Sequence, residues 1–252
     1  MNLMNLPLLV FALSFVVLSL SVQIGDVLRT RLRPLQEDER DDFDLVLGAI
    51  LTLLGLLIGF TFSMAISRYD ERKHYEEAEA NAIGTEYLRA DLIPASDGAR
   101  LRELLKKYID DRIRFYTTND PGMLAQVDAD TAEVQNELWS AVRPVAGAQI
   151  TPVIALAVSG MNDVLNSRGY TEAAWRNRIP VEAWVLMSVV AIVCNSLIGY
   201  VARRTNRRLF LIVPVAVSIS FFLISEIDSP SSGVIRVAPE NLLSLSQVMH
   251  AH

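Results

Sequence analysis

Four windows of the chain contain almost no charged residues, whereas charges crowd the segments between them. A helix needs about 20 apolar residues to cross the roughly 30 Å hydrocarbon layer, because its backbone polar groups must be satisfied internally. The windows run from about Pro7 to Val27, Leu45 to Ile66, Ala183 to Ala202 and Leu209 to Ser225. The fourth window is the shortest. It would span the hydrocarbon layer only if its flanking residues snorkel to the interface or the bilayer thins locally. Four transmembrane helices are therefore predicted.

The long segment between the second and third windows has helical patterning throughout. No break signal occurs between Leu45 and Leu92, so one helix is expected to run until just before Pro94. Three more helices are expected: one capped by Ser96 and Asp97 and reaching Tyr116, one from Asp120 and Pro121 to before Pro144, and one from Thr151 and Pro152 to near Gly169. Because no alternating strand pattern or hairpin dipeptide is present, this segment is predicted to be a helical bundle.

The predicted fold class is an all-α integral membrane protein, with the helical bundle inserted between transmembrane helices two and three. The expected division is transmembrane helices one and two in residues 1–66 and the extramembrane domain in 67–181. Residues 182–228 would hold transmembrane helices three and four, and 229–252 a C-terminal tail. Glu226 and Asp228, just beyond the fourth window, are expected to mark its membrane interface.

Composition and motifs exclude several classes of function. The formal net charge of −6, with basic residues scattered over short connections, argues against a nucleic-acid-binding surface. Cys194 is the one cysteine, lies in an apolar window and is expected to be a small core residue. The sequence has no HExxH, phosphate-binding glycine loop or GxSxG, and His250 and His252 lie in the terminal tail. No enzymatic activity and no cofactor are expected.

One pair of side chains has the spacing of metal ligands. His74 and Glu77 are three residues apart on the expected long helix, so they would share a face. No second histidine is within reach by sequence. The pair is therefore interpreted as part of a solvated charged face, and no metal site is predicted.

Basic residues give opposing indications about membrane orientation. Two short connections hold eight arginines: Arg29, Arg31, Arg33 and Arg40 in one, and Arg203, Arg204, Arg207 and Arg208 in the other. Because short basic loops stay in the cytoplasm, this count places both termini and residues 67–181 outside. Six basic residues beside the inserted domain argue the other way: Arg68, Arg72, Lys73, Arg168, Arg176 and Arg178.

The second window carries two sets of residues at four-residue spacing. Gly55, Gly59 and Ser63 form a small-residue stripe that lets another helix approach closely, either from the same chain or from another copy. Thr52, Leu56 and Phe60 form a neighbouring stripe. If several copies of this helix surrounded an axis, that second stripe would ring a narrow, mostly apolar constriction that gates by dewetting.

Three runs of sequence resemble a known family. Residues 57–72 read LIGFTFSMAISRYDER, residues 79–94 read EANAIGTEYLRADLIP, and residues 233–237 read GVIRV. The first run is similar to the second-span signature of bestrophins, which has a Gly-Phe pair followed eight residues later by an arginine. All three resemble the bacterial bestrophin-like membrane proteins, and that likeness covers nearly the whole chain.

The resemblance implies a function and an assembly. Bestrophins are homopentameric anion channels whose second span lines a hydrophobic neck, and the Gly-Phe alignment carries this pore-facing role to Phe60, Leu56 and Thr52. Thr52 stands where the family has a bulky apolar residue, which implies a looser and wetter ring. The acidic calcium clasp of animal bestrophins has no counterpart here, so no calcium gating is expected. Bestrophins keep their extramembrane helices in the cytoplasm, opposite to the orientation that the eight arginines favour.

Arg68 lies where the second span leaves the membrane. An arginine ring at the edge of a pore would attract anions, whereas a snorkelling arginine would bind lipid phosphates or pair with Asp70 or Glu71.

The leading hypothesis is a homo-oligomeric, pentameric anion channel in the bacterial inner membrane, with the bilayer, its own copies and inorganic anions such as chloride as partners. The alternative is a non-conducting membrane-anchored helical scaffold or sensor, which would need no inward stripe on this helix.

Overall fold

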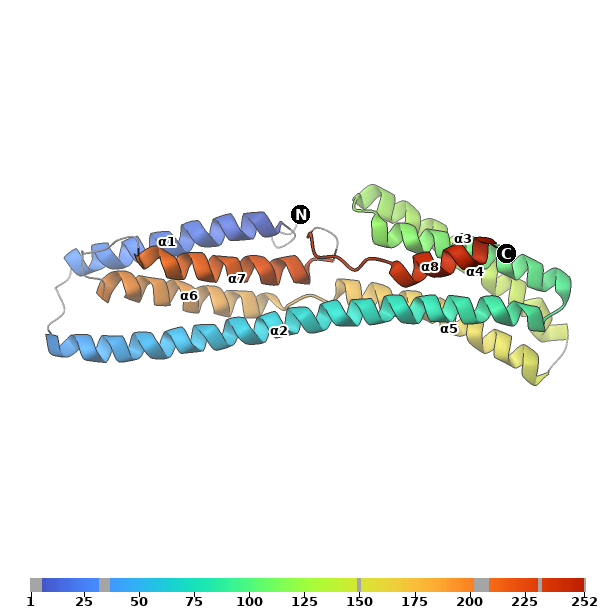
Figure 1. Ribbon diagram of the computed structural model, residues 1–252, viewed down its shortest axis with the longest axis horizontal. Coiled ribbons are helices and arrows are strands. Elements are labelled where there is room, and N and C mark those ends of the chain that lie inside the picture. The colour runs from blue at the N-terminus through green and yellow to red at the C-terminus, as the bar shows by residue number, and fades with distance from the viewer. Residues whose placement is uncertain (1–5, 32–36, 149–150, 202–208, 231–232, 252) are drawn as a thin grey trace. The chain divides into compact units, whose positions relative to one another are not determined.

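The computed structural model describes residues 6–31, 37–148, 151–201, 209–230 and 233–251, and these residues form helices and no strand. The elements in chain order are α1 (Pro7–Arg31), α2 (Glu37–Arg89), the 3-10 turn η2 (Ala90–Leu92), α3 (Ala95–Thr117), α4 (Pro121–Ala148), α5 (Pro152–Arg176), α6 (Val181–Val201), η3 (Leu209–Leu211), α7 (Ile212–Asp228) and α8 (Glu240–Ala251) (Figure 1). The all-helical prediction is confirmed for this part of the chain. The helices form two compact units, one of residues 1–68 and 178–236 and the other of residues 69–177 and 237–252.

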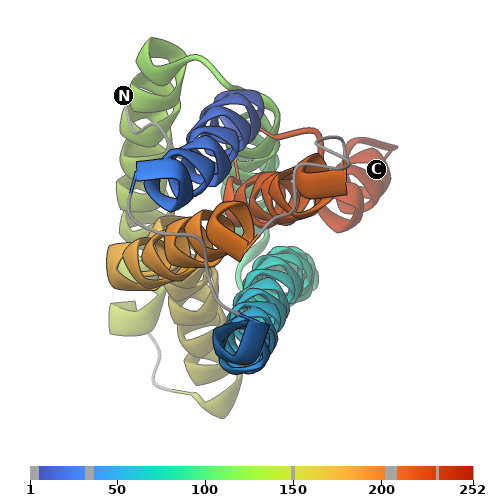
Figure 2. The same cartoon turned by 90° about the vertical axis from the view of Figure 1, so that its left-hand side faces the viewer.

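The first unit contains the apolar helices. In it α1 packs against α6 and α7, and Figure 2 shows these helices close to end-on together with α2. Within the described residues, three helical stretches have an apolar window long enough to cross a membrane: Pro7–Arg31, Glu39–Leu92 and Pro152–Val201. Helix α7 has 17 residues, which corresponds to about 26 Å and is slightly less than the hydrocarbon thickness. The fourth span therefore stays a prediction.

Two glycines bring α1 and α6 into backbone contact. A Cβ at Gly199 would collide with the carbonyl oxygen of Val22 and would lie 3.1 Å from the amide nitrogen of Asp26. A Cβ at Gly25 would lie 2.8 Å from the amide nitrogen of Tyr200. Neither helix could come this close with larger residues at these positions, which is how small residues act in membrane helix pairs. The sequence reading did not single out this pair.

The second unit is a bundle of α3, α4, α5 and α8 with the C-terminal part of α2. Its largest fully buried apolar side chains are Ile83 of α2, Leu101, Leu105, Tyr108 and Ile109 of α3, Leu138 of α4 and Met161 of α5. The α3 residues among them recur at intervals of three and four, so they form one face of the helix.

Several predicted helix ends are confirmed. Helix α2 continues without a break through Arg89 and gives way to η2 before Pro94. The Asp120 carboxylate accepts a hydrogen bond from the Met123 amide at 2.8 Å, and the Thr151 hydroxyl oxygen accepts one from the Ile154 amide at 3.2 Å. Both residues are N-caps, which satisfy amides that the first helical turn leaves without an internal partner.

Other predicted ends are wrong. Ser96 and Asp97 lie inside the first turn of α3, because the helix begins directly after Pro94. Pro144 does not stop α4, which continues to Ala148. The cost of an internal proline is about 3 kcal/mol, and burial of Val142 and Val145 on either side of it offsets a cost of this size. Helix α5 runs past Gly169 to Arg176.

The C-terminal segment contains a helix that was not predicted from the sequence. Residues 240–251 form α8, which packs on α3 within the second unit. The Glu76 carboxylate of α2 accepts hydrogen bonds from the backbone amides of Asn241 and Leu242, both at 3.0 Å, and from the Asn241 side chain at 2.6 Å. A carboxylate at this place satisfies the first amides of α8 and faces the positive end of its dipole. The pairing could not be predicted because its partners are more than 160 residues apart in sequence.

Candidate functional site

In the first unit, α2 has one packed face and one open face. Leu54, Thr61 and Ala65 are buried against the rest of the unit. Leu56 is 53% exposed and Phe60 is 69% exposed. Because an α-helix turns about 100° per residue, Leu56 and Phe60 lie roughly opposite the packed stripe. Two large apolar side chains are thus presented away from the unit that holds the helix.

Thr52 lies one turn before Leu56 and is also exposed. Its hydroxyl donates a hydrogen bond to the carbonyl oxygen of Gly48 at 2.9 Å, four residues earlier in the helix. The hydroxyl proton is therefore held by the backbone, and only acceptor lone pairs and the methyl group face outward. This makes Thr52 less polar than a freely rotating threonine.

Among the described residues, no helix of the same chain packs against the glycines of the small-residue stripe. A Cβ at Gly55 or Gly59 would meet no described atom within 4 Å, and Ser63 is exposed. Around the helix axis, the two glycines lie between the packed stripe and the Leu56–Phe60 face. Packing of this stripe against another copy of the chain remains a prediction, whereas contact with a second helix of the same chain is not found at these glycines.

The other singled-out residues do not form a common site with these stripes. Arg68 is partly buried, and its Nη2 donates to the sulfur of Met64 at 3.7 Å. His74 and Glu77 are exposed. Within the described ranges, no group of three or more His, Cys, Asp or Glu side chains is arranged to hold a metal ion.

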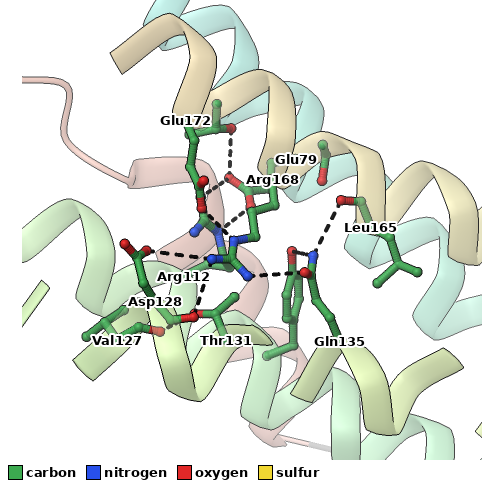
Figure 3. A network of polar contacts seen from close by, with 12 residues as sticks. Glu79, Arg112, Val127, Asp128, Thr131, Gln135, Leu165, Arg168 and Glu172 are labelled. Atoms are coloured by element: carbon green, nitrogen blue, oxygen red, sulfur yellow. Dashed lines mark hydrogen bonds and ion pairs between the residues drawn. The ribbon is translucent and has the colours of Figure 1, made fainter. Parts of the chain in front are cut away.

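The second unit contains a buried ion pair that sequence reasoning missed (Figure 3). Glu79 of α2 and Arg112 of α3 are both fully buried, and Arg112 donates from Nε to Oε1 of Glu79 at 2.5 Å and from Nη2 to Oε2 at 3.4 Å. The hydroxyls of Tyr116 and Thr171 donate to the same Oε2 at 3.4 and 3.1 Å. Glu79 therefore joins α2, α3 and α5 through one carboxylate.

The electrostatics of this cluster favour the charged form of Arg112 and the neutral form of Tyr116. Burial disfavours the charged form of Arg112, but the adjacent Glu79 carboxylate outweighs it and holds the pKa of Arg112 above its ordinary value. Burial, reinforced by Glu79, also raises the pKa of Tyr116, so its phenol remains a proton donor. Removing one member of such a pair costs about 3–5 kcal/mol, because the other charge is left buried alone. The cluster can therefore fix the packing of the three helices that it joins.

A second set of polar contacts joins α4 to α5 beside the first (Figure 3). Arg168 donates to Glu172 at 2.5 Å, to the side-chain oxygen of Gln135 at 3.1 Å and to the carbonyl oxygen of Asp128 at 3.3 Å. The amide of Gln135 in turn donates to the hydroxyl of Tyr108 and to the carbonyl oxygen of Leu165, both at 3.4 Å. Polar contacts therefore link α2, α3, α4 and α5 in sequence across the bundle.

Glu226 and Asp228, at the end of α7, accept hydrogen bonds from the backbone of other segments of the chain. Both are buried. Glu226 accepts a hydrogen bond from the Val234 amide at 2.7 Å, and Asp228 accepts two contacts from the Ile179 amide at 3.2 and 3.3 Å. The sequence placed these acids only as markers of a membrane interface. Their contacts show that they also tie the segment before α6 and the segment after α7 to the end of α7.

The family of the chain is shown by its sequence. A model of the bestrophin-like domain matches residues 13–242. The chain belongs to the bestrophin-like family. No match was found among curated protein sequences. The resemblance carried by the Gly-Phe pair and the two later runs is thereby confirmed, and the match extends over both units of this bestrophin-like protein.

Solved structures show the same fold. A crystal structure of a bacterial bestrophin homologue from Klebsiella pneumoniae, carrying one substitution, has a TM-score of 0.66 and 14% identity, over 96% of this chain and 98% of that one. A second variant of that homologue has a TM-score of 0.64 and 14% identity, over 93% and 98%. The crystal structure of a protein described only as a membrane protein has a TM-score of 0.62 and 16% identity, over 94% and 98%. At these identities the likeness establishes the bestrophin-like fold.

Proposed function

We propose that this bestrophin-like protein is a homo-oligomeric, pentameric ion channel of the bacterial inner membrane that conducts inorganic anions such as chloride. In this proposal the multi-pass first unit lies in the bilayer, and α2 lines a hydrophobic neck with Thr52, Leu56 and Phe60. The observation that carries the proposal is the open apolar face of α2, which lies opposite the face that packs on its own chain.

The arrangement around α2 supports a ring of such helices. Each copy of α2 would rest its packed stripe on its own unit and turn Leu56 and Phe60 toward the axis. Gly55 and Gly59 would lie at the side, where a neighbouring copy can approach because no side chain intervenes. A membrane-anchored scaffold would need only packing and lipid-facing faces on α2, whereas a pore also needs a stripe of residues that can face the axis, which Thr52, Leu56 and Phe60 supply.

Residues outside the neck have secondary roles in the proposal. Residues 67–181 would lie outside the membrane and extend the conduction path. Arg68, where α2 leaves the membrane, would raise the local concentration of anions through its charge. Because no metal cluster is found in the described part of the chain, gating by a bound metal is not included.

The test is the conductance of neck variants in reconstituted bilayers. A narrow apolar ring blocks ions because it excludes water, so Phe60→Ala and Leu56→Ala should raise single-channel conductance. Leu13→Ala is the matched control. Leu13 of α1 is 52% exposed, and this substitution removes the same side-chain atoms as Leu56→Ala. Conductance should be unchanged by this control.

Charge selectivity tests the role of Arg68. If the arginine faces the conduction path, Arg68→Glu should shift the reversal potential toward the equilibrium potential of the cation. If the arginine snorkels to lipid, the reversal potential should not change. Absence of current from both the wild type and the Phe60→Ala, Leu56→Ala double variant would overturn the channel and leave the scaffold as the remaining function.

A further inference from the structure

A carboxyl group without a hydrogen-bond donor is buried where α2 meets α5 in the second unit. The Glu86 side chain is 0% exposed, and neither of its oxygens accepts a hydrogen bond from a described protein group. The nearest cation, Nη1 of Arg89, lies 3.8 Å from Oε2, which is too long for a hydrogen bond. A buried carboxylate needs donors to replace its lost hydration, and Glu79 has four whereas Glu86 has none.

The facing surface of α5 is shaped around this carboxyl group. A Cβ at Gly160 would collide with Oε2 of Glu86 and with Nη1 of Arg89. In this arrangement the ends of both side chains occupy the space that a side chain at residue 160 would otherwise fill. The helices can close over Glu86, but the closed contact supplies no hydrogen-bond donor to its carboxyl group.

The charges around the site do not restore an ordinary pKa. Two described charged residues bear on Glu86: Arg89 on its own helix and Asp163 on α5. The pKa of Glu86 is raised from 4.5 to about 8: burial is the largest cause, Arg89 only partly opposes it, and Asp163 adds to it. At neutral pH the carboxyl group of Glu86 is thus mainly protonated.

We propose that Glu86 is a proton-binding site whose neutral form keeps α2 and α5 in contact and whose ionised form releases them. While α2 and α5 are in contact, the carboxyl group of Glu86 is excluded from water and is neutral. When α5 moves away from α2, water reaches the carboxyl group, which then ionises as an ordinary glutamic acid does. A rise in pH therefore favours the open arrangement.

The expected size of the effect follows from linkage. The open state loses the proton near the ordinary pKa of 4.5, while the closed state keeps it up to about 8. Between these values each rise in pH favours opening, and above about 8 the dependence ends because both states are ionised. From about pH 6 to about pH 9, the equilibrium constant for opening should rise by about 10- to 100-fold.

Hydrogen exchange of α5 amides in the full-length protein tests this proposal. At each pH, exchange near Gly160 is compared between the wild type and Glu86→Gln, a neutral variant of the same shape. Because both proteins are measured at one pH, the intrinsic chemical exchange rates cancel. The ratio of the wild-type rate to the variant rate should rise about 10- to 100-fold from about pH 6 to about pH 9. Glu77→Gln, on an exposed position of the same helix, should show no such rise. A ratio that does not change with pH would overturn the proposal.

Infrared spectroscopy observes the proton itself. The wild type should show the C=O stretch of a protonated carboxylic acid that disappears with a midpoint near pH 8, and Glu86→Gln should lack this band. Asp163→Asn removes a nearby negative charge, so the midpoint should move to lower pH. This variant keeps the test valid even if Glu86→Gln does not fold. Absence of the wild-type band at about pH 6 would overturn the proposal. Neither measurement uses ion current, so the outcome is independent of channel function.

Discussion

The crossing of α1 and α6 gives the sharpest prediction for stability. Gly199→Ala adds one methyl group at a point where the backbones touch. The new carbon would lie 2.8 Å from the carbonyl carbon of Val22 and 3.1 Å from the amide nitrogen of Asp26. Ordinary contacts between such atoms are about 3.5–4.0 Å, so α1 has to move away by roughly 1 Å. A helix backbone cannot rotate out of the way as a flexible side chain can.

The net effect is a balance of two terms. Overpacking of this kind costs about 1–3 kcal/mol, and replacing glycine with alanine inside a helix returns about 1 kcal/mol. The free energy of unfolding should therefore fall by up to about 2 kcal/mol. Reversible SDS unfolding in mixed micelles, followed by the fluorescence of Trp184 on α6, measures this quantity.

Two further variants make the reasoning testable. Gly48→Ala is the matched control, because a Cβ there meets nothing within 4 Å, and it should leave stability equal or slightly higher. Gly25→Ala should resemble Gly199→Ala, and the double variant should lose less than the sum, because one displacement of α1 relieves both collisions. If Gly199→Ala were as stable as Gly48→Ala, the close backbone contact would not exist.

Two other predictions concern orientation and assembly. A reporter enzyme that works only in the periplasm should be active when fused near Gly122 if the eight arginines determine orientation; activity of a cytoplasmic reporter alone would reverse the assignment. Gly59→Leu should lower the stability of the oligomer, because a large side chain would separate helices that meet at this stripe; an unchanged oligomer mass in detergent would show that the stripe faces elsewhere.

Local patterning accounts for the features that could be predicted from the sequence. The uninterrupted α2, the apolar face of α3 and the caps at Asp120 and Thr151 each depend on residues within a few positions of one another. Pro144 is also a local signal, but it predicted the wrong helix end. The burial of Val142 and Val145 is a property of the folded bundle, and it outweighed the local preference.

The polar interior could not be predicted in the same way. Arg72, Glu76, Glu79 and Glu86 recur at intervals of three, four and seven on one face of α2 and are all buried. A search for hydrophobic periodicity misses them because charged residues count as surface. The partner of Glu79 is 33 residues away, so nothing in the local sequence marks it as paired. The open face at Leu56 and Phe60 was visible in the sequence as a stripe, but its direction relative to the packed face needed the structure.

The cap that Glu76 provides to α8 has a consequence for biosynthesis. The carboxylate and the amide of Asn241 are 165 residues apart, and at about 5–20 residues per second roughly ten to thirty seconds of translation separate them. During that interval Glu76 has to remain hydrated, because the amides that replace water have not been made. If translation stops before residue 240, the released chain has a solvated Glu76 on α2, at a position that is buried in the complete protein. Cellular quality control can recognise such a chain through its unfinished second unit, even when the apolar helices of the first unit are already in the bilayer.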